Sequence, residues 1–124
     1  MKTMQDIKNK IEELAVSWGE ALIIGDYRNS NKYNKKITKI VESFKADKIL
    51  GESILIPLLN HPNPSVRLHA SVHALELEIH IQEAEGELTN LANNPDIHVI
   101  GLTAKINLAE WQKKKKAQPV QKDE

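Results

Sequence analysis

Two stretches of this chain repeat each other at an interval of 33 residues, and this period limits the folds that the sequence can adopt. The first copy places apolar, asparagine and proline residues at Leu55, Leu58, Asn60, Pro62, Val66 and Leu75. The second places them at Leu88, Leu91, Asn93, Pro95, Val99 and Leu108. Each copy predicts an apolar helix, an Asn-x-Pro turn and a second apolar helix. Such a period is typical of stacked helical pairs, which build binding surfaces more often than catalytic sites.

Apolar residues recur every three or four positions along most of the chain, and this spacing predicts helices. We expect them over residues 4–24, 29–46, 48–60, 64–80, 82–93 and 96–112. Gly25 suits the end of the first helix, and Asn63 with Pro64 suits the start of the fourth. The sequence therefore predicts one all-α domain over residues 1–112, with about six helices in antiparallel pairs. Residues 113–124 are expected to form a basic, disordered tail.

The fourth predicted helix is apolar on two nearly opposite sides, which is typical of a helix sandwiched between neighbours. One apolar stripe consists of Val66, Ala70, Ala74 and Leu77, and the other of Leu68, Val72, Leu75 and Ile79. Two polar stripes separate them. The first holds Arg67, Ser71 and Glu78, and the second holds His69, His73, Glu76 and His80.

The chain contains no cysteine, which excludes disulfides and thiolate metal sites and fits a reducing compartment. No apolar run approaches the roughly 18–20 residues that span a bilayer, and the first residues lead directly into a charged helix without the apolar core of a signal peptide. We therefore expect a cytoplasmic protein.

The charges are unevenly placed although the chain as a whole is neutral. Residues 49–112 carry two basic and eight acidic residues, a net charge of −6. Residues 1–48 and 113–124 each carry a net charge of +3. An acidic surface repels phosphate backbones and attracts basic proteins, so the repeat half predicts a basic protein partner.

The first copy of the repeat resembles a HEAT repeat. The segment 58–64 is followed by Val66-Arg67-x-x-Ala70-x-x-x-Ala74-Leu75, which nearly meets the HEAT pattern. In such repeats the arginine ties neighbouring helices together. The second copy has Ile100 at the arginine position, and the resemblance therefore implies that it is a terminal, capping unit. The fold that it implies is a HEAT-like α-solenoid.

A narrower resemblance covers roughly residues 5–112. The long first helix, the Gly25-Asp26-Tyr27 turn, the turn at 61–64 and the closing Ala109-Glu110-Trp111 resemble a small bacterial HEAT-like family of uncharacterised domains. Such families are similar to immunity proteins that are found beside toxin genes. The resemblance implies that this chain binds and neutralises a cognate toxin.

The stripe of His69, His73, Glu76 and His80 has two interpretations. Histidines four residues apart can share a metal ion, and Glu76 or His80 could add a ligand. The alternative is a polar stripe that lines a partner-binding groove or faces solvent. There is no His-Glu-x-x-His motif to place a general base for zinc hydrolysis. We assign these residues to partner binding and expect no metal and no cofactor.

Acidic residues gather around the fifth predicted helix, at Glu83, Glu85, Glu87 and Asp96. They are either an ordinary solvated helix start, where acidic groups suit the helix dipole, or a docking surface for a basic partner. The lysine run 113–116 is a solvated tail or an electrostatic contact for nucleic acid. No aromatic residues are interleaved there for base stacking. We expect partners that are neither nucleic acid nor membrane.

These observations predict a binding protein without enzymatic activity. The leading hypothesis is an immunity protein that occludes a cognate toxin, a basic nuclease, through stoichiometric binding. The alternative is a generic HEAT-like interaction module with a different protein partner. A dimer through an exposed end of the repeat is also compatible with this plan.

Overall fold

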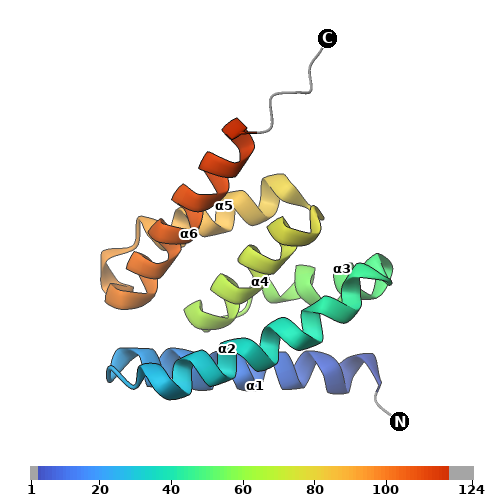
Figure 1. Cartoon of the computed structure of the whole chain (residues 1–124), viewed down its shortest axis with the longest axis horizontal. Coiled ribbons are helices and arrows are strands. Elements are labelled where there is room, and N and C mark those ends of the chain that lie inside the picture. Colours follow the sequence, from blue (N-terminus) through green and yellow to red (C-terminus); the bar gives the residue numbers. More distant parts are fainter. Residues whose placement is uncertain (1–2, 118–124) are drawn as a thin grey trace.

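The structure is a computed structural model that describes residues 3–117, and this part of the chain is all-helical, with six α-helices and no strand (Figure 1). In chain order the helices are α1 (Met4–Ile23), α2 (Tyr27–Glu42), α3 (Lys48–Leu58), α4 (Pro64–Leu77), α5 (Ile81–Ala92) and α6 (His98–Ala117). Two short 3₁₀ turns, η1 (Ser43–Lys45) and η2 (Pro95–Ile97), follow α2 and precede α6. The all-α prediction is confirmed.

The first two helices form an antiparallel hairpin along one edge of the molecule (Figure 1). α1 begins with a capping box, in which the Thr3 hydroxyl accepts from the Asp6 amide and the Asp6 carboxylate accepts from the Thr3 amide. Gly25 has a φ of +78°, a left-handed conformation that glycine adopts without strain, and it turns the chain into α2. α1 also contacts α3, α4 and α6, so the hairpin supports the remaining helices.

Each copy of the 33-residue repeat forms one helical pair, α3 with α4 and α5 with α6. The turn before α4 is built as the sequence predicts. Asn63 accepts hydrogen bonds from the Ser65 and Val66 amides, and Pro64 occupies the first helical position. Pro57 lies in the last turn of α3, so it does not interrupt a longer helix.

α4 lies between two hydrophobic clusters, as its two apolar stripes predict. Val66, Ala70 and Leu77 pack into a cluster with residues of α1, α2 and α3. Leu68 and Leu75 pack into a second cluster with residues of α5 and α6. Ala74 belongs to this second cluster as well, together with Trp18 from α1. α4 is therefore the central helix, and the other five cover it.

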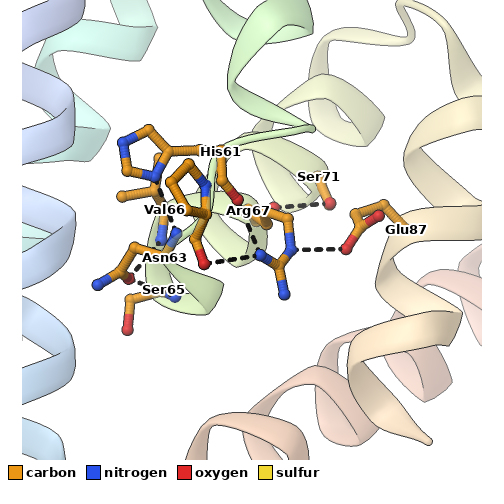
Figure 2. A network of polar contacts seen from close by, with 8 residues as sticks. His61, Asn63, Ser65, Val66, Arg67, Ser71 and Glu87 are labelled. Atoms are coloured by element: carbon orange, nitrogen blue, oxygen red, sulfur yellow. Dashed lines mark hydrogen bonds and ion pairs between the residues drawn. The ribbon is translucent and has the colours of Figure 1, made fainter. Parts of the chain in front are cut away.

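Arg67 ties the turn before α4 to α5 (Figure 2). Its Nη1 donates to the backbone carbonyl of His61 at 2.8 Å and to that of Pro62 at 3.0 Å. Its Nε donates to Oε2 of Glu87 on α5 at 3.0 Å. About one fifth of each side chain is exposed, 22% for Arg67 and 20% for Glu87, so water screens this pair only in part. A single side chain thus links two helical pairs.

α6 continues through the lysine run to Ala117, past the domain boundary predicted at residue 112. Contacts with α5 support this extension. The Trp111 indole N–H and the Lys115 ammonium both donate to the carboxylate of Glu85. The first part of the expected tail is therefore helical, and its remainder, 118–124, lies outside the described residues.

Replacing Arg67 with alanine is expected to lower the free energy of unfolding by about 2–3 kcal/mol, because two backbone carbonyls and the Glu87 carboxylate each lose a donor. Arg67→Lys should recover less than half of the loss, since a lysine cannot reproduce the planar fork. Urea denaturation measures both values. Arg28→Ala, at an exposed position, is the control and should change stability by less than about 0.5 kcal/mol. Equal stabilities of the Arg67 and Arg28 variants would contradict the role given to Arg67.

Candidate functional site

The polar stripe predicted on α4 divides into two parts in the structure. His69, His73 and Glu76 line one cleft, which lies between α2, α4 and α6. His80 does not join them, because α4 ends at Leu77 and Glu78 takes a left-handed conformation with a φ of 58°. The chain turns there, and His80 occupies the N-cap position of α5 without a capping hydrogen bond from its side chain.

The cleft has a volume of about 230 Å³, and four helices contribute to its lining. The lining is mostly polar and mixes imidazole, amide and hydroxyl groups with one carboxylate. Its residues are Trp18 from α1, Asn34 and Thr38 from α2, Leu68, His69, Val72, His73 and Glu76 from α4, and Thr103 and Asn107 from α6. Glu76 is the only acidic residue in this lining, and no basic residue other than the two histidines contributes to it.

The two histidine rings are buried in the wall of the cleft. His69 is 5% exposed and His73 is 4% exposed. The rings of Trp18 and His69 form an edge-to-face contact, with 4.5 Å between the ring centroids. The His69 and His73 rings stack at 5.9 Å. Neither ring therefore faces open solvent, and both contribute to the wall of the cleft.

Both buried rings have an unsatisfied nitrogen. The Nε2 atoms of His69 and His73 have no hydrogen-bond partner within the described residues. Nδ1 of His73 lies 2.8 Å from Oε1 of Glu76, and since a carboxylate only accepts, Nδ1 donates. In the neutral ring of His73, Nε2 then carries a free lone pair. Buried polar atoms without partners are costly, and they are found where a ligand, a water or a function accounts for them.

Burial and, to a lesser extent, the neighbouring His73 lower the pKa of His69 to about 3. His69 is therefore neutral at pH 7. The hydrogen bond from His73 lowers the pKa of Glu76, so this carboxylate is ionised at pH 7. The ionised carboxylate of Glu76, whose side chain is 55% exposed, makes the cleft a site for hydrogen-bond donors.

Glu76 also lies where the cleft adjoins two further cavities. A larger one, of about 630 Å³, runs between α4, α5 and α6 and includes the apolar side chains of Leu75, Ile106 and Trp111. Another, of about 310 Å³, lies toward the end of α2 and includes Lys45. The Glu76 side chain is 55% exposed and lines all three. A partner could thus contact an apolar pocket and an ionised carboxylate together.

The acidic residues predicted as a docking patch have partners inside the molecule. Glu83 pairs with His80, Glu85 accepts from Trp111 and Lys115, and Glu87 pairs with Arg67. His80 also contacts Glu52 on α3, and the hydrogen bonds to Glu83 and Glu52 raise the pKa of His80. Asp96 is exposed in η2, apart from these pairs. Glu85 and Glu87 therefore join α5 to neighbouring helices, whereas Glu83 pairs within the start of α5, and the three do not form one free acidic surface.

Four cleft residues escaped the sequence analysis, namely Asn34, Thr38, Thr103 and Asn107. Each pair is spaced by four residues, which places it on one side of its helix. That spacing was a usable signal, but polar residues on a helix are usually solvated, and only the packing of α2 and α6 around α4 brings the pairs together.

Within residues 3–117, no three His, Cys, Asp or Glu side chains are arranged to hold a metal ion. Nor does that part of the chain contain a helix that combines the length and the apolar character needed to cross a membrane.

A protein-family model described as Domain of unknown function (DUF2019) matches residues 5–111 of the chain. No curated protein and no solved structure matches it.

The buried His69 predicts a specific loss of stability in acid. Its pKa of about 3 in the folded state lies below 6.5, the value expected after unfolding, so the unfolded chain takes up a proton first as the pH falls. Between pH 7 and 5 this should cost about 2 kcal/mol of unfolding free energy. The other titratable groups of the cleft, His73 and Glu76, both come from α4.

His69→Leu should remove that part of the pH dependence, measured by urea denaturation at pH 7, 6 and 5. The raised pKa of His80 acts in the opposite direction, because its stabilisation is present at low pH and is lost as the pH rises, and it does so in wild type and variant alike. His98→Leu, at an exposed histidine, is the matched control and should keep the wild-type pH dependence. Parallel curves for wild type and His69→Leu would refute the assignment.

Proposed function

The chain belongs to the DUF2019 family, and we propose that it is a HEAT-like interaction module that neutralises a cognate toxin by stoichiometric occlusion. Binding, rather than catalysis, would be its activity. The cysteine-free composition supports action in the reducing cytoplasm. The proposal combines the helical pairing, the chemistry of the cleft and the resemblance of the sequence to immunity proteins.

Two features support the HEAT-like arrangement. The 33-residue period coincides with the pairs α3–α4 and α5–α6, so each repeat is one helical hairpin packed on the next. Arg67 bonds the turn of its own pair to Glu87 of the following pair, which is the linking role that the resemblance implies for this arginine. Ile100, at the equivalent position of the second pair, is buried in the hydrophobic cluster, as suits the capping unit that the resemblance implies.

The cleft supports binding of a basic partner, and it is the observation that carries the proposal. Glu76 offers an ionised carboxylate at the meeting point of three cavities, and the hydrogen bond from Nδ1 of His73 holds this carboxylate in place. A lysine or arginine side chain from the partner would donate to this carboxylate, while an apolar neighbour would enter the cavity beside Trp111. Such a contact would place the module over a basic substrate-binding surface, as in a nuclease toxin.

The alternative is a generic interaction module whose partner is not a toxin. Such a module would use the same cleft to bind the same kind of basic side chain, so the geometry of the cleft does not distinguish the two functions. Gene neighbourhood does: a gene immediately upstream whose product stops growth, and whose effect this chain reverses, supports immunity. A housekeeping operon supports the alternative.

Glu76→Lys should weaken binding to the upstream-encoded protein at least thirtyfold and abolish growth rescue, because a central carboxylate is replaced by a repelling charge. The dissociation constant is measured by titration calorimetry after the wild-type 1:1 complex is established by light scattering. Glu20→Lys, at an exposed position on α1 outside the cleft, is the control and should bind like wild type. Unchanged affinity of Glu76→Lys would refute the cleft as the contact.

The acidic surface predicted around α5 is tested separately, with Glu83→Lys and Asp96→Lys. Both positions are exposed, and their reversal leaves the contacts of Glu85 and Glu87 with neighbouring helices in place. Loss of binding in these variants, together with full binding by Glu76→Lys, would move the interface from the cleft to the predicted acidic surface.

A further inference from the structure

The outward face of α2 carries a row of basic side chains. Its five cations are Arg28, Lys32, Lys35, Lys36 and Lys39, at intervals of four, three, one and three residues. This spacing places them on one side of the helix, over about 16 Å of its length. The opposite side holds the buried Ser30, Ile37 and Val41. All five basic residues are exposed.

None of these cations forms an ion pair with another residue of the described chain. The only acidic residue within α2 is Glu42, at its end, and it pairs with Lys45. The glutamates of α5, in contrast, are occupied by Arg67, Lys115 and His80. The row on α2 is therefore an exposed charge that the fold itself does not neutralise.

An apolar tip lies at the end of the hairpin where α2 begins (Figure 1). Ile23, Ile24 and Tyr27 are 65%, 78% and 62% exposed. The turn at Gly25 holds them together within five residues of chain, next to Arg28. Large apolar side chains that project from a turn add nothing to the folded core, so their exposure calls for a partner.

We propose that the α1–α2 hairpin docks on an anionic membrane surface. The tip enters the boundary between headgroups and acyl chains, and the cations of α2 contact lipid phosphates. Peripheral attachment of this kind needs two signals, apolar insertion and basic charge, and the hairpin supplies both. The chain lies on the bilayer and does not cross it. This attachment departs from the expectation that the chain binds no membrane, and it stands independently of the toxin-binding proposal.

The tip favours a lipid surface over a nucleic acid. Phosphates of either would attract the five cations, but the unpaired bases of a single strand stack on aromatic rings rather than on isoleucine side chains. Tyr33, the aromatic residue within the basic row, is half-buried and packs against the hydrophobic clusters. A membrane uses both the charge and the apolar tip.

The experiment is flotation of the full chain with vesicles of 70% phosphatidylcholine and 30% phosphatidylserine, compared with pure phosphatidylcholine. Wild type is expected to partition at least tenfold more strongly into the anionic vesicles, and to lose most of this preference in 0.5 M salt. Lys32→Gln/Lys36→Gln should weaken the binding about thirtyfold, since each cation near the surface contributes roughly a factor of five. Ile23→Ser/Ile24→Ser should weaken it at least tenfold.

The matched control is Lys113→Gln/Lys116→Gln, which removes two exposed lysines from α6 and should leave vesicle binding unchanged. Circular dichroism verifies that each variant is folded. Wild type that fails to float, or α2 and α6 variants that bind equally well, would overturn the proposal. So would binding of a labelled 20-base-pair DNA duplex that depends on Lys32 and Lys36 but not on Ile23 and Ile24, in the absence of vesicle binding.

Discussion

α4 packs against two separate hydrophobic clusters, and the other helices take their places by covering one or the other. The α1–α2 hairpin and α3 bury one side, and α5 and α6 bury the second. When two opposite sides of a helix are buried, its polar residues can occupy only the two narrow strips between those sides. Arg67 on one strip satisfies its donors on backbone carbonyls and Glu87. His69 and His73 on the other are buried with an Nε2 atom unpaired. The cleft is thus a consequence of how α4 is enclosed.

The two strips differ in how their burial is compensated. Arg67 reaches a turn and a neighbouring helix, so its charge stabilises the packing of one pair on the next. The histidines line the cleft between α2 and α6, to which these two helices contribute only amide and hydroxyl side chains. The fold tolerates His69 as a neutral ring, and this ties its stability to pH.

Much of the architecture could be predicted because it depends on short-range patterns. The 33-residue period gave both helical pairs, the Asn63–Pro64 cap fixed the start of α4, and the double apolar stripe identified the central helix. The end of α6 could not be predicted from such short-range patterns. It is supported by the hydrogen bond from Trp111 to Glu85, a residue 26 positions earlier in the chain. The cleft was half predicted. Its α4 residues follow from helical spacing, whereas Asn34 and Asn107 join them only through tertiary packing.

The net charge of a sequence segment does not by itself predict which charged surface the folded protein exposes. Residues 49–112 sum to −6, yet Glu85 pairs with Lys115, Glu87 with Arg67 and Glu83 with His80, so this charge does not gather on one free surface of α5. Residues 1–48 sum to only +3, yet α2 places its five cations on one face and its acidic residue at one end. Since an exposed charge acts over about one Debye length, local placement outweighs the regional total. The acceptors of the cleft and the cations of α2 therefore offer two chemically opposite surfaces on one small chain.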